Sequence, residues 1–200
     1  KVAFRISEST GLVWTPRNVY VEVILNGEHV GNYLLCEHVK VDENRVNIQE
    51  LEEDDVDGGY LMELEAYYDE EFKFKSKIRD LPYMFSDPDE VNEEQFAFMQ
   101  NYINEMEASL YDDERFAQRE YLNYLDIDSH IDWWFVQELT RNWEPNQPRS
   151  TFMYKDKGGK LYTSDSPDLK QEQPQTASSG SGIQNNRQIE SYIPLQDGLS

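Results

Sequence analysis

Cys36 is the only cysteine among the 200 residues, so no disulfide can form within the chain. Basic residues are also scarce: 18 Lys and Arg stand against 40 Asp and Glu, giving a formal net charge of −22. Such a chain repels the phosphates of DNA or RNA and an anionic membrane surface, so nucleic-acid binding is not expected. No apolar run approaches the ~20 residues of a membrane-spanning helix, so no membrane span is expected.

The hydrophobic content of 38% and the aromatic content of 13% favour a folded body. We expect one domain over residues 1–164, followed by a flexible tail over residues 165–200. The tail is rich in Gln, Ser, Asn and Gly and is too polar to offset the entropy lost on ordering, so residues 170–188 are predicted to lack stable structure.

Strand signals dominate the first third of the chain, and helix signals cluster after it, which is an α+β pattern. Asn26-Gly27 between two apolar runs predicts a hairpin over residues 19–39. Residues 60–65 alternate as a strand, and residues 80–88 read as a loop punctuated by two prolines. Asn92 and Gln95 predict the start of a helix whose apolar stripe includes Met99 and Met106.

A second long helix is predicted from Ser129 to about Asn142, with Ser129 as its N-cap and Asp132 as the partner in a capping box. Trp134, Phe135 and Leu139 recur at helical spacing, so we expect them in the core, against the stripe of Met99 and Met106. Trp133 is then expected to point elsewhere, toward a pocket or a partner.

A polar loop follows this helix and ends at a hairpin over residues 151–163. The loop carries Asn142, Glu144, Asn146, Arg149 and Ser150. Polar groups on a loop between rigid elements often perform chemistry. The alternative is an ordinary solvated connection.

Seven short motifs in this order resemble the spore-coat CotH kinase-like family. They are VEVILNGE (21–28), GNYLLCE (31–37), NRVNI (44–48), GGYLME (58–63), RNWE (141–144), STFMYKD (150–156) and GGKL (158–161). The resemblance implies a kinase-like fold, binding of ATP with magnesium and, in some members, phosphorylation of a protein substrate. It also suggests an extracellular or cell-surface setting.

The resemblance assigns the transfer chemistry to the loop and to the run after the hairpin. Glu144 stands where an acid orients the phosphoryl acceptor, although family members often have Asp there. Ser150 is the candidate metal ligand, and Asn146 is the alternative, counted among the cofactor-binding residues. Asp165 and Asp168 are further candidates for magnesium, because carboxylate oxygens suit that ion.

Three residues nearer the N-terminus are assigned to cofactor binding by the same resemblance. Glu37 would orient a basic group near the phosphates, as a Lys–Glu pair does in kinases. Arg45 suits a bidentate phosphate contact. Glu63 lies on the strand that leads into the adenine hinge. Two of them have a plainer interpretation: Glu37 as a surface acid at a strand end, and Arg45 as a member of a salt bridge.

Three departures from the family predict weak or absent phosphoryl transfer. Strands expected upstream of residue 1 are not in this sequence, Glu144 replaces a shorter acid, and the tryptophan–aspartate run after Thr163 is altered. The main alternative is an interaction module that binds a protein or glycan through exposed aromatics and acids. Glycoside hydrolysis by paired carboxylates is a third. The acidic run over residues 52–57 resembles the first half of a calcium-binding loop, but the Glu required at the twelfth position of such a loop is absent. We therefore expect this run to be a solvated loop.

Overall fold

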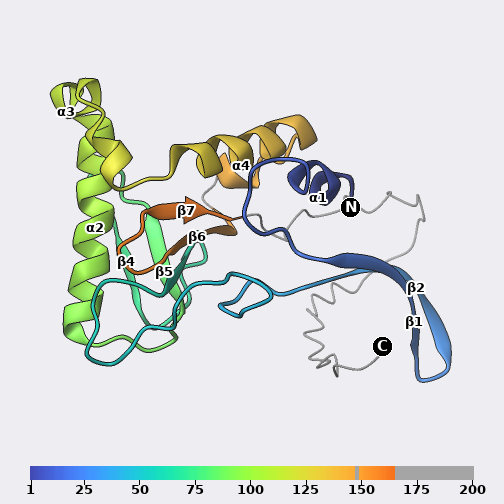
Figure 1. Ribbon diagram of the computed structural model, residues 1–200. Coiled ribbons are helices and arrows are strands. Elements are labelled where there is room, and N and C mark those ends of the chain that lie inside the picture. Colours follow the sequence, from blue (N-terminus) through green and yellow to red (C-terminus); the bar gives the residue numbers. More distant parts are fainter. Residues whose placement is uncertain (147–148, 165–200) are drawn as a thin grey trace, which may run out of the picture. The chain divides into compact units, whose positions relative to one another are not determined.

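The computed structural model describes residues 1–146 and 149–164 (Figure 1). The predicted tail, with Asp165 and Asp168, lies outside the described residues. The elements are α1 (Val2–Ser7), β1 (Asn18–Leu25), β2 (Glu28–Cys36), β3 (Tyr60–Leu64), β4 (Lys73–Lys75), β5 (Pro82–Asp87), α2 (Glu93–Tyr111), α3 (Asp113–Ala117), η1 (Glu120–Asn123), α4 (Ile127–Thr140), η2 (Glu144–Asn146), β6 (Thr151–Lys155) and β7 (Leu161–Thr163). This mixture of helices and strands agrees with the α+β prediction.

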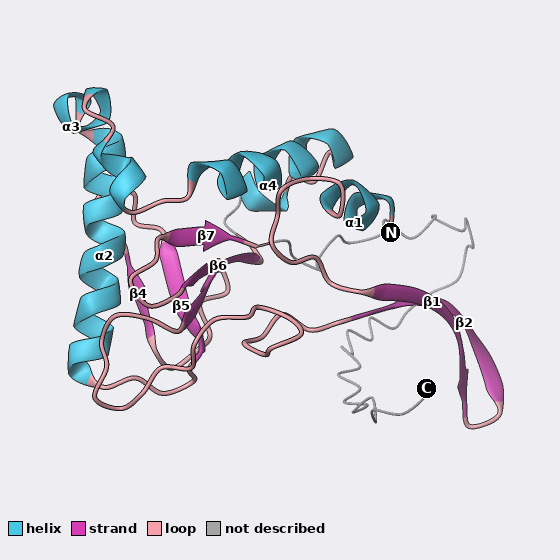
Figure 2. Ribbon diagram, in the orientation of Figure 1, coloured by secondary structure: helices cyan, strands magenta, loops and turns pink. Residues whose placement is uncertain are grey.

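Five strands form an antiparallel sheet in the order β4-β5-β3-β6-β7 (Figure 2). The central strand, β3, pairs with β5 and β6, which explains why Tyr60, Leu61 and Met62 are all fully buried. Because side chains alternate along a strand, Tyr60 and Met62 belong to the core cluster that includes α2, while Leu61 belongs to a second cluster on the other face. Both faces of the sheet are therefore covered.

The predicted helix after Asn92 is α2, and its capping box is confirmed. Asn92 accepts hydrogen bonds from the backbone of Glu94 and Gln95, and the Gln95 side chain accepts one from the Asn92 backbone. The buried stripe of α2 packs on the sheet through Met99, Ile103 and Met106. No helix in the described part of the chain is both long and apolar enough to cross a membrane.

The prediction of a loop over residues 80–88 is wrong, because residues 82–87 form strand β5 in the sheet. Pro82 is the first residue of the strand, where its missing N–H removes no ladder hydrogen bond. Its carbonyl accepts a hydrogen bond from the backbone of Glu65 at 3.1 Å. The two prolines thus mark the ends of a strand.

The β1–β2 hairpin is confirmed and forms a separate two-stranded sheet. Asn26 and Gly27 both have positive φ, at 53° and 85°, as a type I′ turn requires. Apolar side chains on the hairpin remain exposed to solvent, including Val19, Ile24 and Leu35.

Helix α4 begins earlier than predicted. Its N-cap is Asp126, whose side chain accepts a hydrogen bond from the Ser129 backbone at 2.9 Å. Ser129 lies inside the helix, and its hydroxyl accepts a hydrogen bond from the backbone of Thr163 in β7 at 3.2 Å. Asp132 accepts a hydrogen bond from the Gly11 backbone, not from an N-cap. The predicted capping box is therefore wrong.

The predicted core face of α4 is also wrong. Trp134, Phe135 and Leu139 are 54%, 48% and 55% exposed, whereas Trp133 and Val136 are buried. The helix packs on α1 and β7, and none of the three predicted residues belongs to the core cluster that holds the methionine stripe of α2. The buried face includes polar residues whose hydrogen bonds offset their burial, so it does not stand out as an apolar stripe.

The acidic run before β3 was predicted to be a solvated loop. In the structure it is instead bound to the β6–β7 turn. The buried ammonium of Lys155 pairs with Asp57, and the exposed ammonium of Lys157 pairs with Asp55. Asp57 also accepts a hydrogen bond from the Gly158 backbone at 3.2 Å. We call the contacts of Asp57 with Lys155 and Gly158 the lysine clasp.

Candidate active site

The C-terminal end of α4 turns sharply and directs Glu144 into the protein. Arg141 adopts the left-handed conformation with φ 57° and ends the helix. Asn142 then donates to the side chain of Gln137 at 2.8 Å and accepts from the Glu144 backbone at 3.3 Å. Glu144 is only 5% exposed, so it is not the solvated loop acid of the plainer interpretation.

Ser150, the candidate metal ligand, lies against a buried carboxylate that the sequence reasoning did not assign to the site. Its backbone N–H and its hydroxyl donate to one oxygen of Glu65, at 3.1 and 3.4 Å. The other oxygen of Glu65 accepts from the Tyr67 backbone at 2.9 Å. The two residues meet because Glu65 follows β3 and Ser150 precedes β6, and Leu64 pairs with Thr151.

Arg149 brings a positive charge to the same strand ends. Its guanidinium lies 5.1 Å from the ring centre of Tyr67, a distance typical of a cation–π contact. Its Nε is buried and has no hydrogen-bond partner among the described residues. Glu65, Tyr67, Arg149 and Ser150 together form what we call the strand-end cluster.

Glu37 and Arg45 belong to a second group of charges, at the base of the β1–β2 hairpin. The Glu37 carboxylate accepts from the backbone and the Nε of Arg17, both at 2.8 Å. Burial alone would raise the pKa of Glu37, but the hydrogen bonds from Arg17 and the charges of Arg17 and Arg45 lower it overall. In the opposite direction, the hydrogen bond to Glu37 raises the pKa of Arg17, so both groups are held in their charged forms. This hairpin-base cluster therefore holds two arginines around one carboxylate.

Sequence reasoning missed Arg17 and Glu65, and each had a signal. Arg17 directly precedes the first strand of the hairpin and Glu37 directly follows the second, so a tight turn predicts that they meet. Glu65 lies two residues after Glu63 and shares its face of the strand. Glu63 itself lies in β3, opposite Phe152 and Met84, and is partly buried.

The strand-end cluster supplies hard oxygen ligands of the kind that Mg²⁺ prefers. Magnesium usually binds one or two carboxylates and completes its shell with waters and substrate phosphates, and the carboxylate of Glu65 beside the hydroxyl of Ser150 fits that pattern. In residues 1–146 and 149–164 no group of three or more His, Cys, Asp or Glu could hold a metal by itself. The Asn146 side chain, like Asp165 and Asp168, lies outside what is described.

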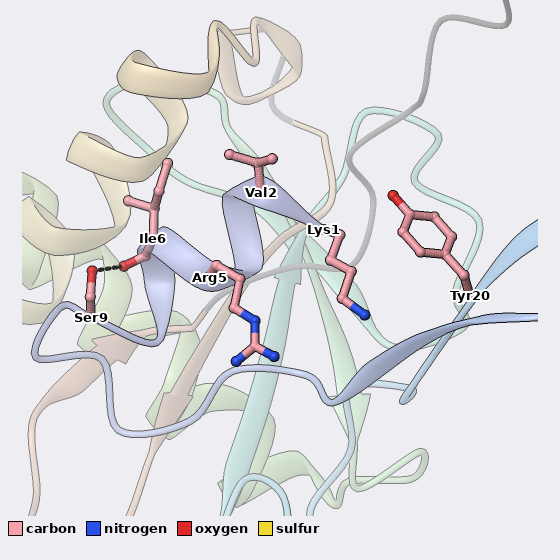
Figure 3. Close-up of a pocket in the computed structure, with 6 residues that line it drawn as sticks. All are labelled: Lys1, Val2, Arg5, Ile6, Ser9 and Tyr20. Atoms are coloured by element: carbon pink, nitrogen blue, oxygen red, sulfur yellow. Dashed lines mark hydrogen bonds between the residues drawn. The ribbon is translucent and has the colours of Figure 1, made fainter.

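An open pocket of about 510 Å³ lies elsewhere, between α1 and the start of β1 (Figure 3). It is lined by Lys1, Val2, Arg5, Ile6, Ser9 and Tyr20. Arg5 pairs with Glu8 at 2.6 Å, and the Lys1 ammonium lies 5.3 Å from the ring centre of Tyr20. No candidate residue lines this pocket, so we do not assign the chemistry to it.

Cys36 is half-buried, and burial raises the pKa of its thiol. A raised pKa disfavours the thiolate that nucleophilic catalysis requires. Cys36 is therefore not a candidate nucleophile.

Comparisons with known proteins support the resemblance in the sequence motifs. No curated protein and no solved structure matches the chain. A family model, described as CotH kinase protein, matches residues 1–165, and this range includes both clusters, Glu63 and Glu144. The chain therefore belongs to the CotH kinase family.

Proposed function

We propose that this chain is a kinase-like domain that binds a nucleoside triphosphate with Mg²⁺ and transfers its phosphoryl group weakly or not at all. The proposal includes a kinase-like arrangement of the fold. The observation that carries it is the contact between Ser150 and the buried carboxylate of Glu65. The Ser150 hydroxyl, which the sequence motif indicates as a metal ligand, thus lies beside the Glu65 carboxylate, which could be a second oxygen ligand.

Glu65 and Ser150 are the residues that would hold the cation. When bound, Mg²⁺ supplies charge neutralisation on the β- and γ-phosphates. Glu65 already accepts hydrogen bonds from the backbones of Tyr67 and Ser150, which fix its orientation before any ligand binds. Arg149, beside Tyr67, would offset the negative charge of the phosphates at the same strand ends.

The hairpin-base cluster offers a second place for phosphate oxygens. Glu37 holds Arg17 through its Nε, while the Arg17 side chain remains 74% exposed. A guanidinium that is held on one side and open on the other can bind an anion with little loss of conformational freedom. Arg45 adds charge near Glu37. In a chain of net charge −22, such arginines are scarce.

Glu144 is the residue proposed to orient the acceptor hydroxyl of a protein substrate. Its side chain is one methylene longer than that of Asp, so its carboxylate is displaced by about a bond length from where Asp would hold it. A displacement of about 1 Å can reduce a rate by about a hundredfold. This residue and the altered run after Thr163 are the reasons for proposing weak transfer.

The test is a phosphoryl-transfer assay on the full chain with ATP, Mg²⁺ and a generic protein acceptor. The Glu144→Asp variant should transfer faster than the native chain, and Glu144→Ala should not exceed the background. The exposed acid Glu43 provides the matched control, because Glu43→Asp should change nothing. Rapid transfer by the native chain, unaffected by Glu144→Ala, would refute this account of the site.

The second candidate, an interaction module, is favoured by one observation. Helix α4 exposes a row of large apolar side chains instead of burying it. The two functions are compatible, because the row lies on the solvent side of α4 and Glu144 is buried beyond the end of that helix.

A further inference from the structure

One face of α4 has the side-chain pattern of a binding surface. Its large apolar residues stand at positions i, i+3, i+4 and i+8, and another follows the helix. They are Ile131 (52% exposed), Trp134 (54%), Phe135 (48%), Leu139 (55%) and Trp143 (58%). We call these five residues the α4 face. The opposite side of the helix buries Trp133 and Val136 against α1 and β7, so the orientation of α4 is set by packing.

The α4 face is too large to be treated as scattered apolar exposure. Single exposed apolar side chains are normal on protein surfaces. Five half-exposed side chains of this size together expose on the order of 500 Å² of apolar surface, an amount typical of an interaction site. Three of the five are aromatic, and aromatic residues dominate the binding energy of interfaces.

Two carboxylates lie within this stripe and indicate the charge of the partner. Asp128 is one turn before Ile131, and Glu138 is one turn after Trp134. Both are exposed, and neither forms an ion pair within residues 1–146 and 149–164. An apolar row that carries two unpaired acids is complementary to a helix that carries an apolar row flanked by Lys or Arg.

We propose that the α4 face is a docking surface for a cationic amphipathic helix of a partner protein. The net charge of −22 supports a basic partner, because it accelerates the encounter with cations. The same charge opposes a second copy of this chain, whose like charges would repel, and an anionic membrane. An interface of this size is at the small end of the specific range, so the complex is expected to be transient.

The probe is a synthetic helical peptide of 14 residues, the length of α4, with Leu on one face and Lys elsewhere. Binding to the full chain is followed by fluorescence anisotropy of a dye on the peptide. A scrambled peptide of the same composition controls for attraction between opposite charges, and a Gln-for-Lys peptide controls for apolar contact. The amphipathic Lys peptide should bind about tenfold or more tightly than either control.

Substitutions assign the binding to the α4 face. Trp134→Ala and Leu139→Ala should each weaken it about tenfold or more. Ile78→Ala, an exposed apolar side chain elsewhere, should leave it unchanged. The double variant Asp128→Asn/Glu138→Gln should weaken binding of the Lys peptide and leave that of the Gln peptide unaffected. Because these side chains are exposed, the variants should fold as the native chain does, which circular dichroism verifies.

Several results would overturn the proposal. They are no binding of the Lys peptide, equal binding of the scrambled peptide, or equal loss of binding with Ile78→Ala. Dimers in light scattering that Trp134→Ala abolishes would identify a second copy as the occupant. Binding to neutral or anionic vesicles that Trp134→Ala abolishes would identify a membrane. None of these outcomes depends on nucleotide binding, so they leave the proposed function untouched.

Discussion

Replacement of Asp57 by Ala should destabilise the protein well beyond what its position in an acidic loop indicates. Asp57 is the carboxylate of the lysine clasp, and its partner Lys155 is 1% exposed. The Lys155 ammonium also lies 5.4 and 5.2 Å from the ring centres of Phe98 and Tyr102. Asp57→Ala would leave a buried positive charge with two aromatic rings and one backbone carbonyl of Asp156, at 3.3 Å, as its remaining partners.

The magnitude follows from burial. Removal of one partner of a buried ion pair costs about 3–5 kcal/mol, because the other charge stays buried and uncompensated. The Asp57 side chain is 43% exposed, so the pair is only partly removed from water and its loss should cost less than that of a fully buried pair. We therefore expect a loss of about 2–3 kcal/mol in the free energy of unfolding. Lys155→Met removes the buried charge itself and should cost less than Asp57→Ala.

Urea denaturation followed by tryptophan fluorescence measures these changes. The matched control is Lys157→Ala, which breaks the neighbouring pair with Asp55. The Lys157 side chain is 56% exposed, so its loss should cost less than about 1 kcal/mol. If Asp57→Ala costs no more than Lys157→Ala, the lysine clasp does not hold the acidic loop in the way that the structure indicates.

Three further predictions concern stability. Trp133→Ala should lower the free energy of unfolding by about 3–5 kcal/mol and Trp134→Ala by less than about 1 kcal/mol in urea denaturation, because only Trp133 is buried. Equal losses would contradict the orientation of α4 described above. Burial lowers the pKa of His130, so the unfolded chain binds a proton at higher pH than the folded chain does. The free energy of unfolding should therefore decrease as pH falls below about 6.5, and His130→Asn should reduce that slope. Gly59→Ala should cost about 1–3 kcal/mol more than Gly158→Ala; both glycines have positive φ, but only at Gly59 would the added Cβ meet a backbone oxygen, 2.2 Å away.

Local chemistry allowed part of the fold to be predicted. The β1–β2 turn follows from Asn26-Gly27, because few other residues tolerate two successive positive φ angles. The start of α2 follows from Asn92 and Gln95, whose side chains are three residues apart and cap each other. Both features depend on neighbours in the sequence, so the sequence alone specifies them.

The orientation of α4 depends on distant neighbours and could not be predicted in the same way. Its sequence carries two possible faces, and the more apolar one is exposed. The buried face is selected by contacts with α1 and β7, including the bond between Ser129 and Thr163, 34 residues apart. Hydrophobic periodicity shows that a helix has a face, but not which partner covers it.

In the candidate site too, contacts between sequence neighbours could be predicted and contacts between distant residues could not. Ser150 could be proposed from its place in a motif, but its contact with Glu65 joins residues 85 positions apart through the pairing of β3 with β6. The partner of Glu37 could be predicted from the hairpin, because Arg17 and Glu37 flank its two strands. The roles given to Glu37, Arg45, Glu63 and Asn146 in cofactor binding, to Ser150, Asp165 and Asp168 in metal binding, and to Glu144 in catalysis stay predictions.

The most direct test of the central claim is a calorimetric titration of the full chain with a non-hydrolysable ATP analogue, with Mg²⁺ and with EDTA. We predict saturable binding that requires Mg²⁺ and that Glu65→Gln or Ser150→Ala weakens about tenfold or more, as expected for the loss of a metal ligand or of its orienting partner. Glu43→Gln, at an exposed acid, should bind as the native chain does. Absence of binding, or binding of equal strength in EDTA and in the Glu65→Gln variant, would contradict the claim.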